Sequence, residues 1–281
     1  MKKREFGRTG IEVPVIGQGT WNLERDFRAE AVTALRRGLD AGMAHVDTAE
    51  MYGGGRVEEL VGEALAGRRA EVFLVSKVLP SNASFEGTLA ACERSLKRLR
   101  TDHLDLYLLH WPSDEHPLEQ TLAALEKLVE QGKTRLWGLS NFDAGELEAA
   151  LRLAGPGRIA CNQVLYNLDH RYAEAALLPM CQTNGIALVG YSPFGSGDFP
   201  SPRGAGGRVL AGIAGRLGAS PRAVALAFLT RLPGTFTIPK AASVGHALEN
   251  ARAGSLQLSA EDVGALEAAF AGGTDASLPV I

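Results

Sequence analysis

The chain carries eight short apolar stretches, each followed by a polar, glycine or aromatic residue, and this recurrence restricts the possible folds more than any other feature. The segments between them have apolar residues at helical spacing, as Ala31, Leu35 and Leu39 illustrate. Eight alternating strand–helix units without a linker are typical of an α/β protein with a closed parallel sheet. We therefore expect residues 1–281 to form a single (β/α)8 TIM barrel domain. The expected strand ends are Gly17, Asp47, Lys77, His110, Asn141, Gln163, Tyr191 and Lys240.

An open, doubly wound sheet is the alternative architecture. Such a sheet usually carries a glycine-rich phosphate fingerprint after its first strand, and Gly17-Gln18-Gly19 lacks the third glycine of that pattern. The barrel is therefore favoured. In a barrel of this kind the chemistry lies at the carboxyl ends of the strands, so we expect the active site and any cofactor site at that face.

Three segments show where the alternation of strands and helices begins and where it becomes irregular. Val13–Ile16 is expected as the first strand of the barrel, leading into Gly17. The Gly-, Pro- and Ser-rich stretch Ser192–Gly207 is too long for an ordinary connection and is expected to be a loop. An additional helix is expected over Ser220–Leu232, because Ser220-Pro221 suits a helix cap and first residue.

Composition limits the partners of the chain. It has 46% apolar and 22% charged residues and a net charge of −3, which predicts neither nucleic acid nor a membrane surface as a partner. Cys92, Cys161 and Cys181 are odd in number and widely spaced, as expected of free thiols in a reducing compartment. We expect a cytoplasmic protein that acts on a small molecule, with a monomer as the default state.

Four side chains at or beside three consecutive strand ends form a candidate proton-donating site: Asp47, Tyr52, Lys77 and His110. A tyrosine phenol has a reference pKa of roughly 10 and needs a neighbouring cation to become a useful acid. Lys77 is the expected cation, and Asp47 is expected to keep it charged and in place. His110 is expected to orient a carbonyl oxygen. His45, on the same strand face as Asp47, is interpreted as structural, because no second ligand cluster completes a metal site.

A site that donates a proton and holds an oxygen needs a hydride source, which no side chain provides. The polar side chains of Ser140, Asn141 and Gln163 at consecutive strand ends suit a carboxamide, and Tyr191 offers a ring face. These residues fit a nicotinamide, although each of them taken singly is also compatible with a structural role in a loop.

A series of motifs runs in order along nearly the whole chain: Gly17-Gln18-Gly19-Thr20-Trp21, Asp47-Thr48-Ala49 with Tyr52-Gly53, Lys77, the run from Asp105 to Pro112, Gly138-Leu139-Ser140-Asn141-Phe142, Asn162-Gln163, Tyr191-Ser192-Pro193, and Ile238-Pro239-Lys240 with Glu249-Asn250. With these motifs the sequence resembles the aldo-keto reductase family. The resemblance implies a catalytic tetrad of Asp47, Tyr52, Lys77 and His110, an extended NADP held across the barrel mouth, and a carbonyl pocket walled by Trp21 and Trp111.

The resemblance also implies the remaining site residues. Tyr52 and His110 join the two tryptophans in contacting the substrate. The loop after Tyr191 is expected to fold over the cofactor, with an acid–base clasp between Asp198 and Lys240 in which Asn22 replaces a second lysine. The implied cofactor contacts are Gly19, Thr20, Trp21, Asp47, Ser140, Asn141, Gln163, Tyr191, Ser192, Pro193, Phe194, Gly195, Ser196, Asp198, Lys240, His246, Glu249 and Asn250.

Two departures from the family pattern concern the cofactor and the substrate. Ala241 and His246 stand where the family often has a Ser or Thr and an arginine; NADPH is expected, and NADH stays possible. The long C-terminal substrate loop of the family is largely missing after a helix that ends near Phe270, which implies an open pocket.

The predicted function is NADPH-dependent reduction of aldehydes or ketones to alcohols. Two alternatives stay open at this point. One is a Schiff-base aldolase that uses Lys77, which Asp47 disfavours by stabilising the charged amine. The other is a non-catalytic protein of the same fold that binds a nucleotide as a sensor, which the intact tetrad disfavours.

Overall fold

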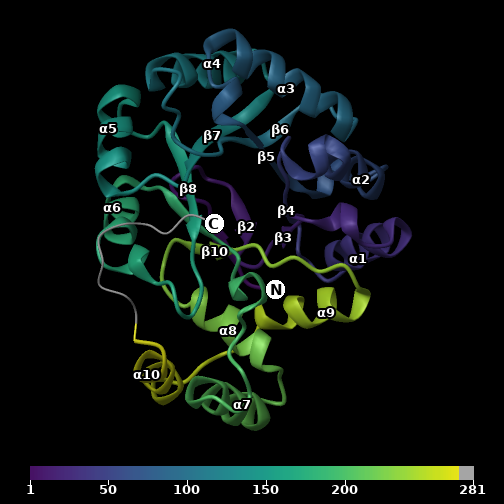
Figure 1. The fold of residues 1–281 in the computed structure, drawn as a ribbon, viewed down its shortest axis with the longest axis vertical. Coiled ribbons are helices and arrows are strands. Elements are labelled where there is room, and N and C mark those ends of the chain that lie inside the picture. The colour runs from purple at the N-terminus through teal and green to yellow at the C-terminus, as the bar shows by residue number, and fades with distance from the viewer. Residues whose placement is uncertain (272–281) are drawn as a thin grey trace.

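A computed structural model describes residues 1–271 of the protein (Figure 1). Within them, eight parallel strands form one sheet whose spatial order follows the order of the chain. Helices surround the strands on the outside (Figure 1). The strands are β3 (Gln18–Gly19), β4 (His45–Asp47), β5 (Phe73–Val78), β6 (Leu104–Leu109), β7 (Thr134–Ser140), β8 (Ile159–Leu165), β9 (Ala187–Tyr191) and β10 (Thr235–Thr237).

Backbone pairing between the first and last strands closes the sheet. Ile16 pairs with Thr237 and Gly19 pairs with Lys240, both in parallel. The amide of Gly17 donates a hydrogen bond of 2.8 Å to the carbonyl of Thr237. The predicted (β/α)8 barrel is therefore confirmed. Every residue of β5, β6 and β8 is buried, as expected when a parallel sheet is covered on both faces.

The helices bury apolar residues, and a polar side chain caps the start of several of them. In α4, Leu122, Leu125 and Leu128 are buried at helical spacing. In α5, Asp143 and Glu146 form a reciprocal capping box that satisfies amides at the helix start. The helices are α1 (Arg28–Asp40), α2 (Arg56–Ala64), α3 (Phe85–Leu99), α4 (Leu118–Glu130), α5 (Ala144–Ala154), α6 (Leu177–Asn184), α7 (Ala205–Leu217), α8 (Pro221–Leu229), α9 (Val244–Ala253) and α10 (Ala260–Ala269).

The predicted first strand, Val13–Ile16, was wrong at its start, although Ile16 does pair with Thr237 of the last strand. Val13 lies in β2 (Glu12–Pro14), which pairs with β1 (Lys3–Glu5) in an antiparallel hairpin outside the barrel sheet. The first barrel strand, β3, begins only at Gln18. The hairpin places Phe6 under the barrel, where its ring packs against His45, Phe73 and Phe236. Burial lowers the pKa of His45 to about 4, so this imidazole is a neutral member of the barrel floor.

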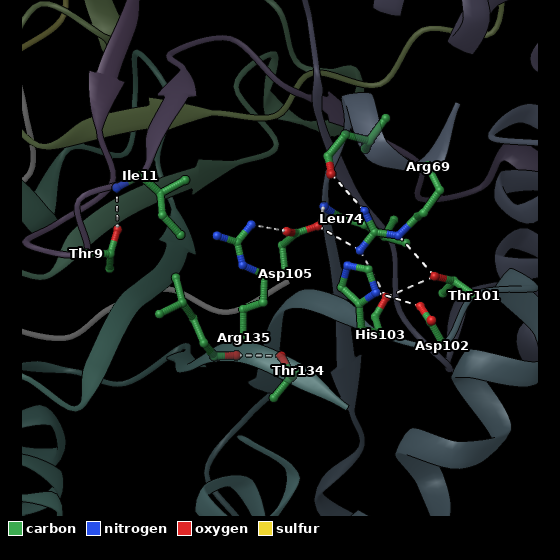
Figure 2. A network of polar contacts seen from close by, with 12 residues as sticks. Thr9, Ile11, Arg69, Leu74, Thr101, Asp102, His103, Asp105, Thr134 and Arg135 are labelled. Atoms are coloured by element: carbon green, nitrogen blue, oxygen red, sulfur yellow. Dashed lines mark hydrogen bonds and ion pairs between the residues drawn. The ribbon is translucent and has the colours of Figure 1, made fainter. Parts of the chain in front are cut away.

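A network of charged side chains joins the starts of the middle strands (Figure 2). The carboxylate of Asp105, near the start of β6, accepts hydrogen bonds from Arg69 at 2.8 Å, from Arg135 at 3.0 Å and from the backbone amide of Leu74 at 2.9 Å. Asp105 is buried. These hydrogen bonds connect β5, β6 and β7 at the end of the strands that is opposite Lys77. The site lies at the other end, where the strands have their carboxyl ends.

The stretch after β9 differs from the expected loop. Helix α7 begins at Ala205, inside the predicted loop Ser192–Gly207, and was not predicted. It packs beside α10 (Figure 1).

None of the helices within residues 1–271 combines the length and the hydropathy of a membrane span. The expectation of an open pocket concerns the segment after Phe270, of which residues 272–281 lie outside the described residues.

Candidate functional site

Three consecutive strand ends and one turn bring the expected catalytic side chains together. Asp47 ends β4, Lys77 lies near the end of β5, and His110 directly follows β6. Tyr52 opens a short 3-10 turn, η2 (Tyr52–Gly55). The three glycines at positions 53 to 55 all have positive φ, a conformation that L side chains rarely adopt. They allow the chain to leave the strand end sharply and to return the phenol to it.

Lys77 is the centre of the hydrogen bonds at this site. Its ammonium donates to Asp47 Oδ1 at 2.5 Å, to the carbonyl of Thr48 at 2.9 Å and to the Tyr52 hydroxyl at 3.4 Å. The side chains of Lys77 and Asp47 are 0% and 1% exposed. Burial opposes the charge of Lys77, but Asp47 and Tyr52 outweigh it, so the pKa of Lys77 is raised. The lysine is therefore a fixed cation and is unsuited to Schiff-base chemistry, which needs a neutral amine.

Burial and the charge of Lys77 act on the phenol in opposite directions. The ammonium of Lys77 lowers the pKa of Tyr52, as expected of a neighbouring cation, but the burial of the phenolate raises that pKa by more. At neutral pH Tyr52 therefore holds its proton.

His110 lies beside the phenol as a neutral imidazole. Its ring is 5.8 Å from the Tyr52 ring, measured between centroids, and stacks on Trp111 at 3.8 Å. Burial, with a smaller contribution from Lys77, holds the pKa of His110 well below its usual value. A neutral imidazole has one N–H, which suits a hydrogen bond to a carbonyl oxygen placed between His110 and Tyr52.

A second group of polar side chains lies on the opposite side of the barrel mouth. Gln163 donates through Nε2 to Asp47 Oδ2 at 2.8 Å, so both carboxylate oxygens of Asp47 have partners. The Tyr191 hydroxyl donates to Asn141 Oδ1 at 2.9 Å, and Asn141 Nδ2 donates to the carbonyl of His110. The Ser140 hydroxyl donates to the backbone of Gln163. These bonds fix the two amides and the tyrosine ring relative to the tetrad.

A cavity of about 440 Å³ opens above these residues. Most of the side chains predicted for the site line it, but Lys77 and Ser140, and also Gly195 and Asp198 of the following loop, do not belong to its lining. Met51, Gly197 and Ile238 line it and were not among the predicted site residues. Met51 directly precedes Tyr52 in the sequence, and this adjacency is the signal by which it could have been predicted. The lining is Gly19, Thr20, Trp21, Asn22, Asp47, Met51, Tyr52, His110, Trp111, Asn141, Gln163, Tyr191, Ser192, Pro193, Phe194, Ser196, Gly197, Ile238 and Lys240.

A second cavity of about 670 Å³ adjoins the first, and Lys240 lines both. It is bounded by the start of α9, where Ser243 caps the helix by accepting from the amide of His246. Arg25, Asp26 and His246 are further lining residues. Of the two other residues predicted on this helix, Asn250 is buried and Glu249 is partly buried, and neither lines either of these two cavities.

The predicted clasp between Asp198 and Lys240 is not formed in this structure. Lys240 Nζ instead pairs with Asp26 Oδ2 at 2.5 Å. The loop that carries Asp198 is held elsewhere: the Arg222 guanidinium lies over the rings of Phe194 and Phe199, at 5.7 and 4.9 Å from their centroids. No local pattern in the sequence indicates the pairing of Asp26, because its partner is 214 positions away.

Backbone strain is concentrated around the first cavity. Within residues 1–271, five non-glycine residues have positive φ, and four of them line this cavity. They are Asn22, Asn141, Ser192 and Ser196, with φ between 48° and 64°. A side chain in this region costs free energy that the surrounding structure must supply. Such outliers gather where function sets the geometry, and their positions support this face of the barrel as the candidate site.

The fold and the site define a barrel oxidoreductase, and comparison with known protein families agrees. Residues 15–271 match the model of the Aldo/keto reductase family. The chain belongs to this family. By family it is an enzyme that reduces carbonyl groups.

Individual relatives resemble the chain over almost its whole length. It is 43% identical over 262 residues to methylglyoxal reductase YeaE of Escherichia coli, covering 92% of each chain. It is 35% identical to glyoxal reductase of Bacillus subtilis, covering 92% of this chain and 90% of the relative. The solved structure of an aldo/keto reductase from Klebsiella pneumoniae in complex with NADP and acetate superposes with a TM-score of 0.93 at 40% identity, covering 100% of this chain and 99% of that one.

Proposed function

We propose that the protein reduces aldehydes or ketones with NADPH, with Tyr52 as the proton donor. The observation that supports this most directly is the hydrogen bond from a buried, charged Lys77 to the Tyr52 hydroxyl, at the floor of a cavity that His110 also lines. In the reaction a hydride adds to the carbonyl carbon and the phenol proton adds to the oxygen. The phenolate left on Tyr52 is stabilised by Lys77, which Asp47 holds in place.

The residues of the two cavities fit an extended dinucleotide. The first cavity presents the amides of Asn141 and Gln163 and the ring of Tyr191, which suit a nicotinamide carboxamide and its ring. The second presents Lys240, Arg25 and the start of α9, all of which attract phosphate. When bound, the dinucleotide supplies the hydride. A solved relative from Klebsiella pneumoniae was crystallised with NADPH, and we expect the same cofactor for this chain.

Small aldehydes that carry an adjacent carbonyl are the proposed substrates. Two relatives are named as methylglyoxal and glyoxal reductases. In this chain Trp21, Met51 and Trp111 give the cavity apolar walls beside Tyr52 and His110. These walls suit a small uncharged molecule. We expect kcat/KM for methylglyoxal to exceed that for propanal, and equal values for the two would contradict this substrate class.

Tyr52→Phe tests the mechanism. The change removes the proton donor and should lower kcat/KM for methylglyoxal by roughly 10²- to 10⁴-fold. NADPH affinity should change less than about twofold, because the Tyr52 hydroxyl bonds to Lys77 and does not line the second cavity, where the phosphate is expected. NADPH absorbance measures turnover, and NADPH fluorescence measures binding.

Tyr107→Phe is the matched control. The Tyr107 hydroxyl is buried and makes no hydrogen bond to the described residues, so the same loss of one oxygen should leave turnover close to normal. Near-normal turnover of the Tyr52→Phe protein would refute Tyr52 as the donor.

A further inference from the structure

The ion pair between Asp26 and Lys240 joins two parts of the barrel rim that are far apart in the chain. Asp26 follows the short turn η1 (Leu23–Arg25) after β3, and Lys240 follows β10. Their side chains are 31% and 35% exposed. The pair is therefore partly hydrated, and it can open without leaving a buried charge unpaired.

Lys240 stands at the junction of the two cavities, whereas Asp26 lines only the second. The second cavity presents groups that attract an anion, namely Arg25, Lys240 and the start of the ten-residue helix α9, although Glu30 lines it as well. A carboxylate at 2.5 Å from its lysine opposes that preference. An anion that binds Lys240 must displace Asp26 or share the lysine with it.

We propose that Asp26 is an internal competitor for Lys240 that weakens the binding of the cofactor's 2′-phosphate. This inference rests on the proposed function, because it takes NADPH as the ligand of both cavities. Asp26 neutralises Lys240 before the cofactor binds. The phosphate must break that ion pair to reach Lys240, and this cost reduces the net free energy of binding. Asp26 thereby sets how strongly the enzyme prefers NADPH to NADH, which carries no 2′-phosphate.

Asp26→Asn tests this competition, because it keeps the size of the side chain and removes its charge. The dissociation constant for NADPH, measured by fluorescence titration, should fall about three- to fivefold, the upper range for a partly exposed ion pair. The constant for NADH should change less than about twofold. Glu30→Gln is the control: Glu30 lines the same cavity and forms no ion pair with the described residues, so the same charge change should have a smaller effect.

Repeating Asp26→Asn in a Lys240→Met background separates competition from general charge repulsion. Without the lysine there is nothing to compete for, and the gain in NADPH affinity should disappear. Three results would overturn the inference: an unchanged constant, weaker NADPH binding, which would show that Asp26 positions Lys240 for the cofactor, or a gain that persists without Lys240. If the unaltered protein binds no NADPH, it is the proposed function that fails.

Discussion

Lys77→Met removes one partner from the buried ion pair at the centre of the site, and its effect on stability can be worked out from the structure. The change leaves Asp47 with the amide of Gln163 as its remaining side-chain partner. Asp47 is 1% exposed, so water cannot replace the ammonium. Breaking a buried pair in this way typically costs about 3–5 kcal/mol.

The loss of folding stability caused by Lys77→Met has an upper limit and depends on pH in a defined way. An unpaired buried carboxylate escapes its penalty by binding a proton. For a carboxylic acid with a reference pKa of ~3.9, protonation costs about 4 kcal/mol at pH 7 and about 1.5 kcal/mol at pH 5. The variant protein would bind that proton when folded but release it when unfolded. Its loss of stability should therefore be about 4 kcal/mol at pH 7 and should shrink by about 2.5 kcal/mol as the pH falls to 5.

Urea denaturation followed by circular dichroism at the two pH values measures this loss. The double variant Asp47→Asn with Lys77→Met is the control, because it removes both charges. It should be more stable than Lys77→Met at pH 7 and should show little of the pH dependence. A loss that is the same at pH 5 and pH 7, or a double variant no more stable than the single one, would refute the reasoning.

Two further predictions concern cofactor binding. His246→Arg adds a permanent positive charge to the second cavity and should raise the NADPH/NADH affinity ratio about fivefold; an unchanged ratio in fluorescence titration would show that the start of α9 does not contact the phosphate. NADPH should slow amide hydrogen exchange in residues 195–204, the irregular part of the loop before α7, and Asp198→Ala should speed NADPH dissociation in stopped-flow measurements. Equal exchange with and without NADPH would argue that the loop does not close over the cofactor.

The parts of the fold that were predicted well are those in which local pattern and tertiary structure agree. The strand predicted to end at His110 is β6, Leu104–Leu109, because a mostly apolar run followed by a polar residue suits a strand buried on both faces. The strand ends at Asp47, Lys77 and His110 were found for the same reason. The barrel then places their side chains together without further information.

The errors arose where tertiary contacts override local preference. Helix α7 contains four glycines, which disfavour a helix. Two of them have a packing reason: a Cβ at Gly206 would lie 2.4 Å from the Phe270 ring, and one at Gly207 would lie 1.9 Å from the carbonyl of Ser201. Val13 was assigned to the barrel because apolar periodicity does not distinguish a strand of the wall from a hairpin that covers its floor.

The strained backbone around the first cavity has a consequence for selection. Asn22, Asn141, Ser192 and Ser196 all adopt positive φ. A side chain in the left-handed region costs about 1–2 kcal/mol that glycine does not incur, and asparagine incurs less of this cost than serine. A library screened only for heat resistance would therefore favour glycine at these positions, most strongly at the two serines. The survivors would lose the Asn141 amide that bonds Tyr191, and also the hydroxyl–hydroxyl bond between Ser196 and Ser192. Resistance to heat and a rigid first cavity are thus competing goals in the directed evolution of this barrel.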